Sequence, residues 1–375
     1  MARVTIWGDF KANKTDRLSL SGDLTYLLNK SDVNIVNFEA PITCIGIPMR
    51  KSGPNISQCA DSPEWLERYG FNLVSMANNH AMDFGKEGMN ATMMAFQKAS
   101  VIGCGTWEKA YRLKIVETAD GLKVGFLACT HCEFGTLTDA TSKDNLGTAW
   151  ALAPDFEKAI QHGGDCCDFL IVIAHCGVEF LEQPLPEWRE RYKRWIELGA
   201  DAVIASHPHV PQGWEFYHGK PVCYSLGNFC FDRRGKKVVP KNWYNSLCCI
   251  LDLDKQKEIR MTIRPIVFDA KTRYISDNTS DEFNAYLNRI NMVLSKEGDY
   301  MDYVNRSVLQ LLPHYMNQFS RGGLIHNPFS IGFVKGLAEG LLGRGLLKKE
   351  HWLNNLQCES HRWVIQRAVK LKEQR

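Results

Sequence analysis

The chain has 375 residues, of which 45% are hydrophobic, 23% charged and 11% aromatic, an ordinary composition for a globular protein. Its 45 basic and 42 acidic residues give a net charge of +3. This near balance argues against a dedicated nucleic-acid-binding protein. The length exceeds what one small core needs, so we expect one large α/β domain with an appendage.

The first residues do not predict a signal peptide, because the apolar run is short and is interrupted by Asp9. No apolar stretch is long and uncharged enough to span a bilayer. The nearest candidate, residues 328–347, carries internal charges. We expect it to be a core helix, and docking to a partner or a membrane-surface enzyme is the alternative. We therefore expect a cytoplasmic protein, with peripheral attachment to the inner face of the membrane as an option.

The 13 cysteines are expected to be reduced thiols in such a protein. Cys129 and Cys132 form a C-T-H-C sequence at the end of a predicted strand. A redox motif of this kind opens a helix instead, so we expect neither a redox role nor a separate zinc role for this pair.

Apolar, β-branched runs alternate with helical patterns through roughly the first 205 residues. The predicted order is strand 3–9, helix 22–30, strand 33–39, helix 61–70, strand 71–79 and helix 87–100. In the last of these helices, Met89, Met93 and Phe96 are expected to face the core. A hairpin then joins strands 111–118 and 122–130 through an Asp-Gly turn. The alternation resumes with helix 153–164, strand 168–177, helix 186–199 and strand 201–206.

Antiparallel strands are predicted next. Two short ones flank Gly219-Lys220, and two longer ones, 246–254 and 258–269, form a meander. From about residue 278 the strand signal stops, and the helical patterns are 280–298, 300–319 and 351–375. Units of βαβ type followed by antiparallel strands predict mixed sheets covered by helices. We therefore divide the chain into an α/β domain, residues 1–270, and a helical C-terminal extension, residues 278–375.

Five predicted strands end in side chains that bind metals. These residues are Asp9, Glu39, Asn79 with His80, His175, and His207 with His209. In parallel α/β sheets the carboxyl ends of the strands gather at one edge, where ligands bind. Taken singly, each residue has an ordinary alternative as a turn, cap or hydrogen-bonded core residue. Their joint occurrence at strand ends predicts a metal site.

The ligand types indicate the metal. Carboxylate and imidazole together suit Zn, Mn or Fe, and a carboxylate can bridge two cations. A proline keeps the residue before it extended, and alternate residues of an extended chain point the same way. We therefore expect His207 and His209 to reach the same cluster across Pro208.

The chain resembles the CapA-type, poly-γ-glutamate capsule-biosynthesis family, a branch of the calcineurin-like metallophosphoesterases. The ordered segments that carry the resemblance are GDF, NFEAPIT, SMANNHAMDFG, VIAHCGVEF and ASHPHVPQGWEFYHGKPVCYSLGNFCFD. They span roughly residues 3–268 and leave the C-terminal hundred residues uncovered. The resemblance implies an α/β/β/α sandwich of two mixed sheets flanked by helices, with a centre for two divalent metal ions.

The resemblance also implies ligands. They are Asp9 and His209 for the first ion, Asn79, His175 and His207 for the second, and Glu39 between the two ions. The wider superfamily has a histidine two residues after the first aspartate, whereas this chain has Lys11. The first metal site is therefore expected to be weak.

The implied reaction is metal-assisted hydrolysis with in-line attack by water. His80 is the implied general acid or charge stabiliser. Asp83 and Glu179 are candidates to orient imidazoles through their free ring nitrogen. A cap on the following helix is an equal alternative for Asp83.

Two basic segments are candidates to bind an anionic substrate. Residues 49–55 contain Lys51 and Asn55, and residues 233–241 contain Arg233 and Arg234. For the second segment, a solvated loop is the alternative. Ser225 and Asn228 are locally turn residues, and their role at the substrate site is implied only by the resemblance.

We expect a metal-dependent hydrolase of the phosphoesterase type, acting on a phosphorylated or polyanionic intermediate of capsule or exopolymer metabolism. The polymer is expected to be poly-γ-glutamate or a polysaccharide. One alternative is a non-catalytic component of a capsule-polymer synthesis complex, and another is an amide hydrolase of poly-γ-glutamate. The complete ligand set favours catalysis, while Lys11 favours the non-catalytic role. Envelope-polymer synthesis proteins are the expected partners.

Overall fold

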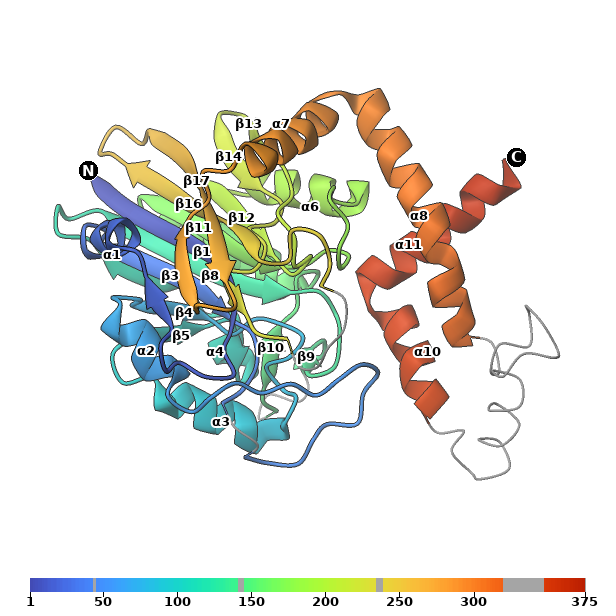
Figure 1. Cartoon of the computed structure of the whole chain (residues 1–375), viewed down its shortest axis with the longest axis horizontal. Coiled ribbons are helices and arrows are strands. Elements are labelled where there is room, and N and C mark those ends of the chain that lie inside the picture. The colour runs from blue at the N-terminus through green and yellow to red at the C-terminus, as the bar shows by residue number, and fades with distance from the viewer. Residues whose placement is uncertain (43–44, 141–144, 234–238, 320–346, 375) are drawn as a thin grey trace.

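The computed structural model describes residues 1–42, 45–140, 145–233, 239–319 and 347–374 (Figure 1). A nine-stranded mixed sheet forms one half of its centre. Its parallel neighbours are β1 (Ala2–Lys11), β3 (Val33–Phe38), β4 (Leu73–Ser75) and β5 (Ser100–Ile102). An antiparallel meander continues from β1 through β16 (Asn245–Leu253), β17 (Ile259–Asp269) and β18 (Tyr274–Asp277). Two short strands, β2 (Ser19–Leu20) and β15 (Cys230–Phe231), pair with β18 and with the end of β1.

A six-stranded sheet forms the other half. Its central strands are parallel and are β8 (Lys123–Thr130), β11 (Phe169–His175), β12 (Ala202–Ser206) and β14 (Lys220–Cys223). Its antiparallel edges are β7 (Lys114–Glu117), in the predicted Asp-Gly hairpin, and β13 (Trp214–Tyr217). A small third sheet contains β6 (Cys104–Gly105), β9 (Thr136–Leu137) and β10 (Gly147–Ala149).

Helices cover the outer faces of the two large sheets. Those before the second sheet are α1 (Gly22–Asn29), α2 (Ser62–Arg68), α3 (Gly85–Ala95) and α4 (Trp107–Ala110). Those within and after it are α5 (Pro154–Cys166), α6 (Pro186–Glu197), α7 (Asp281–Ser295), α8 (Glu297–Phe319), α10 (Leu347–Gln357) and α11 (Glu359–Glu373).

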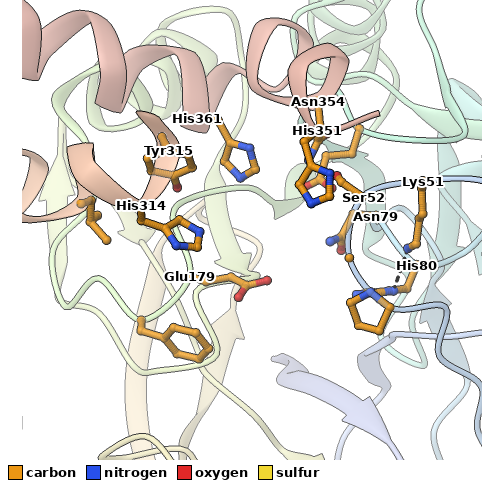
Figure 2. A pocket seen from close by; sticks show the side chains of 15 residues that line it. Lys51, Ser52, Asn79, His80, Glu179, His314, Tyr315, His351, Asn354 and His361 are labelled. Atoms are coloured by element: carbon orange, nitrogen blue, oxygen red, sulfur yellow. Dashed lines mark hydrogen bonds between the residues drawn. The ribbon is translucent and has the colours of Figure 1, made fainter. Parts of the chain in front are cut away.

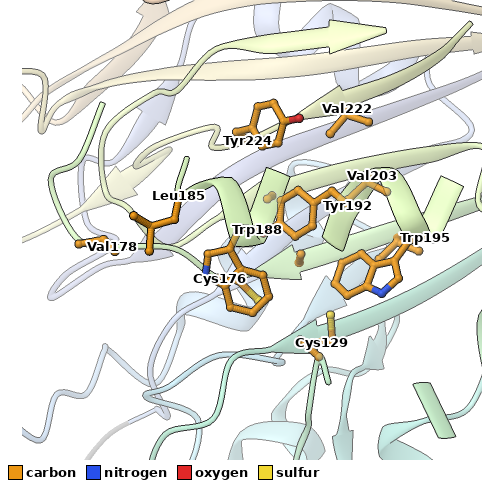
Figure 3. Close-up of a cluster of buried hydrophobic side chains, with 14 of the residues drawn as sticks. Cys129, Cys176, Val178, Leu185, Trp188, Tyr192, Trp195, Val203, Val222 and Tyr224 are labelled. Carbon is orange, nitrogen blue, oxygen red and sulfur yellow. The ribbon is translucent and has the colours of Figure 1, made fainter. Parts of the chain in front are cut away.

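Three buried clusters separate these layers. Successive residues of a strand point to opposite faces of its sheet, so Ile35 packs between the two sheets while Val36 packs beneath the helices of the first sheet. Met89 and Phe96 are buried in that helical layer with Met93 against them, as predicted. On the outer face of the second sheet, the aromatic residues of α6 pack over Val203 and Val222 (Figure 3). The predicted order of helix, sheet, sheet and helix is confirmed.

The C-terminal region is helical, as predicted, but residues 351–375 do not form one helix. The structure has a break at Cys358, which caps the start of α11. Tyr300 of α8 and Val364 of α11 belong to the same buried cluster as α6. The division of the chain at residues 270–278 stays a prediction, and residues 328–346, for which a core helix or docking segment is predicted, lie outside the described residues.

The described residues contain no helix that combines the length and the apolarity needed to cross a bilayer. Every cysteine in the described ranges is a free thiol.

A close backbone contact positions the first predicted ligand. The register of β1 against β3 shifts between Trp7 and Asp9, which places a bulge at Gly8. The Asp9 amide donates to the Gly227 carbonyl at 2.9 Å. A Cβ atom on Gly8 would lie 1.9 Å from that carbonyl oxygen. Only glycine fits at this position without moving one of the two segments.

We therefore expect Gly8→Ala to lower the free energy of unfolding by about 1–3 kcal/mol, the usual cost of overpacking a core. Gly22→Ala is the matched control, because a Cβ atom there meets nothing within 4 Å. Urea denaturation followed by circular dichroism measures both. Equal stability of the two variants would contradict the close contact.

Candidate metal centre

The carboxyl ends of strands from both large sheets meet at one place. Asp9 lies in β1, Glu39 follows β3, and Asn79 lies in the loop after β4. His175 ends β11, and the histidines of His207-Pro208-His209 follow β12. All six predicted ligands are buried, so the structure brings the complete set together. Their roles as ligands stay a prediction.

Glu39 lies between two groups of these side chains. In the first, ligand atoms of Asp9, Glu39 and His209 all lie within 4.8 Å of one another, with His209 Nε2 3.6 Å from Glu39 Oε1. In the second, His175 Nε2 is 3.2 Å from both Asn79 Oδ1 and His207 Nδ1. The same nitrogen is 3.8 Å from Glu39 Oε1. This geometry is compatible with a carboxylate shared by two cations.

The electrostatics of the centre also fit a cation. Burial, together with the charges of Asp9, Glu179 and Asp83, holds the pKa of Glu39 well above its ordinary value. Its Oε1 atom is buried without a hydrogen-bond partner. Burial also lowers the pKa values of His175 and His207, which favours the neutral imidazoles that bind metals. A divalent cation would give the Oε1 atom of Glu39 a partner. It would also reduce the repulsion between the carboxylates of Asp9 and Glu39.

The backbone of the two histidines differs from the prediction. Strand β12 ends at Ser206, and φ is 104° at His207 and 59° at His209, so the segment is not extended. Such conformations cost about 1–3 kcal/mol each and persist only where the surroundings hold them. Asn228 holds this one, because its Oδ1 lies 2.9 Å from His209 Nδ1. Both imidazoles reach the cluster, but through a bent chain.

Two asparagines that the sequence reasoning missed organise the centre. Asn37 Nδ2 donates to Asp9 Oδ1 at 2.7 Å and lies 3.1 Å from His175 Nδ1. Asn78 Nδ2 donates to Asn37 Oδ1 at 3.1 Å and to the Phe38 carbonyl. Asn37 precedes Glu39 by two residues, so the period of a strand was the signal that places both on one face.

His80 forms a separate triad at the rim. Its Nδ1 lies 2.7 Å from Asp83 Oδ2, and Lys51 forms an ion pair with the same carboxylate. Phe84, not Asp83, is the cap residue of α3, so the structure favours the orienting role for Asp83. The bond fixes the ring of His80, and its remaining nitrogen, Nε2, is available to the pocket that His80 lines.

The other predicted residues occupy three kinds of position. Ser225 and Asn228 are buried, and Ser225 donates to the Val210 carbonyl. They therefore brace the loop of the histidines from behind, and their contact with substrate stays a prediction. Asn55 donates to the Met49 carbonyl and so closes its own loop. Arg233 stacks on Trp243, 4.7 Å from its ring centre, and Arg234 lies outside the described residues.

Glu179 does not orient an imidazole. Its side chain is exposed at the pocket, and no hydrogen bond to a histidine is present among the described residues. The geometry therefore makes it a pocket wall instead of a support for a ligand.

Lys11 is buried, and its ammonium group is hydrogen-bonded to other residues. Its Nζ donates to Asn13 Oδ1 at 2.5 Å and to the Asp232 carbonyl at 3.0 Å. Among the described residues, the His, Cys, Asp and Glu side chains of the first group are therefore Asp9, Glu39 and His209, and the weakness of a first metal site stays a prediction.

A cavity of about 480 Å³ opens above the centre. Lys51, Asn79 and His80 line one side, and Glu179 lies across from them (Figure 2). Phe180 also lines the cavity. The C-terminal helices supply the remaining wall with His314, Tyr315, His351, Asn354 and His361. The sequence reasoning missed these histidines, because helical periodicity alone does not show which distant segment a helix packs against.

Residues 1–233 match the protein family described as "Bacterial capsule synthesis protein PGA_cap". The chain belongs to this family. The resemblance that the ordered motifs carry is thereby confirmed for most of the chain's length.

Curated relatives agree with membership in the PGA_cap family. The Capsule biosynthesis protein CapA of Bacillus anthracis is 30% identical over 216 residues, which cover 55% of this chain and 52% of the relative. The PGA biosynthesis protein CapA of Bacillus subtilis is 29% identical over 211 residues, which cover 55% of each chain. This chain therefore spans about half the length of the curated relatives it matches. A calcineurin-like phosphoesterase of Bacillus subtilis is structurally similar, with a TM-score of 0.42 and 13% identity over 70% of this chain and 90% of that chain.

Glu39→Gln tests the centre in metal-free protein. The pKa of Glu39 is higher in the folded chain than in the unfolded chain, so the folded state binds more protons. Stability of the metal-free parent therefore falls as the pH rises above about 4. At neutral pH we expect the variant to be more stable than the parent by about 1.4 kcal/mol per unit of raised pKa. Near pH 4 the two should converge.

The same variant should bind divalent cations more weakly at this centre, so that added zinc raises the unfolding temperature of Glu39→Gln by less than that of the parent. Glu258→Gln, at an exposed glutamate, is the matched control and should behave as the parent does. A Glu39→Gln protein that is destabilised at neutral pH and keeps the parent's full zinc response would exclude Glu39 as a shared ligand.

Proposed function

We propose that this PGA_cap protein is a metal-dependent hydrolase of the phosphoesterase type, acting on a phosphorylated or polyanionic intermediate of capsule or exopolymer metabolism. The observation that carries the proposal is Glu39. Its buried, unpartnered Oε1 atom lies within 4 Å of His175 and His209. A chain that only binds a partner has no need for this costly arrangement.

The proposed ligands are the side chains of the two groups on either side of Glu39. Asp9, Glu39 and His209 would hold one ion, and Asn79, His175 and His207 with Glu39 would hold the other. When bound, such ions supply Lewis-acid activation of water and of a phosphoryl group. Zn, Mn and Fe all suit this donor set.

The chain's own contribution is proton transfer and orientation. Asp83 accepts from His80 Nδ1, which fixes the ring so that Nε2 can deliver a proton to the leaving oxygen. Lys51 neutralises part of the Asp83 charge and places a cation beside the same point.

The cavity suits an anionic substrate with additional polar groups. Lys51, His314 and His351 offer donors to phosphate or carboxylate oxygens, while Glu179 offers an acceptor. The names of the relatives, which refer to capsule and PGA biosynthesis, support an intermediate of envelope-polymer metabolism. Envelope-polymer synthesis proteins and a cytoplasmic site of action are part of the proposal.

One observation favours a second candidate, a non-catalytic component of a polymer-synthesis complex. Lys11 stands where the wider superfamily has a histidine, and it is engaged with Asn13 and the Asp232 carbonyl. A weak first metal site would leave binding without turnover. Amide hydrolysis of poly-γ-glutamate is the third candidate, and including that polymer in the assays below separates it from phosphoester hydrolysis.

We expect His80→Ala to lower kcat on a generic phosphodiester or phosphomonoester by about 100-fold to 10,000-fold, the usual contribution of a general acid. Metal content should not change, because His80 is not a proposed ligand. Asp83→Asn should lower kcat less and should alter its pH profile, since the asparagine leaves the ring in place but changes its tautomer. His162→Ala, at an exposed residue of α5, is the control and should leave kcat unchanged.

The parent protein is assayed with Zn, Mn and Fe, and metal is measured in each sample. Bound metal without turnover under all three conditions would contradict the hydrolase and support the assembly role. Release of glutamate from poly-γ-glutamate without hydrolysis of either phosphoester would support the amide hydrolase.

A further inference from the structure

A second cluster of metal-binding side chains lies outside the Glu39 centre. It forms where the loop after β8 meets the junction of α10 and α11. Ligand atoms of His131, Glu133 and Cys358 all lie within 4.8 Å of one another. The first two come from the family-matched part of the chain, and Cys358 comes from beyond residue 233. Two segments more than two hundred residues apart therefore bring together an imidazole, a carboxylate and a thiol.

Surrounding bonds fix the orientation of His131. The residue is fully buried, and its Nδ1 lies 3.0 Å from Ser360 Oγ. Ser360 Oγ also accepts a hydrogen bond from Trp188 Nε1 at 2.9 Å. The other ring nitrogen, Nε2, lies 3.0 Å from Glu133 Oε1. This pattern, with one nitrogen held by a hydroxyl and the other facing a carboxylate, is typical of a histidine prepared for a cation.

Cys358 is a buried thiol in an unusual setting. It caps the start of α11 and is fully enclosed. Burial, with the charge of Glu133 added to it, raises the pKa of the thiol well above its ordinary value. A cation between the sulfur and the carboxylate would reverse this balance, because it would stabilise both as anions.

His361 is available for a fourth position. It follows Cys358 by three residues on α11 and therefore lies on the same side of the helix. Its Nδ1 is buried without a hydrogen-bond partner, and its side chain lines the same cavity as Glu133 (Figure 2). His361 thus lies beside the cluster, although the 4.8 Å group itself contains His131, Glu133 and Cys358.

We propose that His131, Glu133 and Cys358 bind a divalent zinc-type cation, with His361 closing a four-coordinate site. Thiolate, imidazole and carboxylate together are a zinc donor set, and four ligands are usual for a structural zinc site. Binding releases the thiol proton to solvent. The sequence reasoning placed no zinc at Cys129 and Cys132, and neither residue belongs to this cluster; the relevant cysteine is Cys358.

Such a site would fasten the C-terminal helices beside the Glu39 centre. The His131 ring centre lies 4.4 Å from that of His207, and Glu359 next to Cys358 accepts from the Cys132 amide at 2.7 Å. The cavity wall that carries His314 and His351 would then be held in place by the cation.

Cobalt binding tests the proposal, because a cobalt ion bound to the Cys358 thiolate has a characteristic absorption band. The full chain is stripped of metal with a chelator and titrated with Co²⁺ under reducing conditions. A bound thiolate gives a sulfur-to-cobalt charge-transfer band in the near ultraviolet, which the proposed ligands of the Glu39 centre cannot produce. We expect this band in the parent and its complete loss in Cys358→Ser.

Two controls assign the band. Cys166→Ser changes a half-buried thiol that contacts His162 and lies outside the proposed site, and it should keep the band. His209→Ala should lose cobalt from the Glu39 centre and also keep the band, which separates this site from the proposed hydrolase.

Glu133→Gln covers the case in which Cys358→Ser does not fold, as judged by circular dichroism. It should weaken cobalt affinity, read from the same band, by about 10-fold to 100-fold. No band in the metal-loaded parent, a band that survives in folded Cys358→Ser, or parent-like affinity in Glu133→Gln would each overturn the proposal.

Discussion

A buried pair of carboxylates is the constraint on which the rest of this structure depends. Asp9 and Glu39 are both fully buried, close to each other and to the imidazoles of His175 and His209. Two such charges repel each other strongly in a medium of low dielectric constant. Asn37 stabilises the pair, because its side-chain amide donates to both carboxylates. That amide cannot satisfy every oxygen, and Glu39 Oε1 is left over.

The architecture around this pair follows from it. The Gly8 bulge lets β1 approach Gly227 and sets the position of Asp9. The positive φ angles at His207 and His209 bend the chain after β12 over the same point. Each feature is locally unfavourable, and together they assemble one centre from two sheets. Local strain at a site that the surrounding packing stabilises is a general property of functional centres.

Much of the site was predictable because strand ends are visible in the sequence. Apolar runs that stop at Asp9, Glu39 and His175 predict side chains gathered at the edge of one parallel sheet, and the structure brings them together from the strand ends of two sheets. Asn37 could have been predicted from the two-residue period of a strand, but an uncharged amide is a weak signal for a metal site. The bent backbone of His207-Pro208-His209 could not be predicted. It is held by contacts with Asn228 and Gly177, which are distant in the sequence. The histidines of α8, α10 and α11 were also inaccessible, since helix–helix and helix–loop docking leaves no local pattern.

The bonds between α11 and the second sheet carry a practical consequence for expression fragments. The family match ends at residue 233, which makes a boundary near there attractive for truncation. Such a fragment would lose Ser360 and Trp363, the partners of the Trp188 indole. It would also lose Glu359, which accepts from the Trp150 indole. Two tryptophans would then be exposed to water on an uncovered apolar surface. Such a surface promotes aggregation. Residues outside the family match thus cover apolar surface of the matched part.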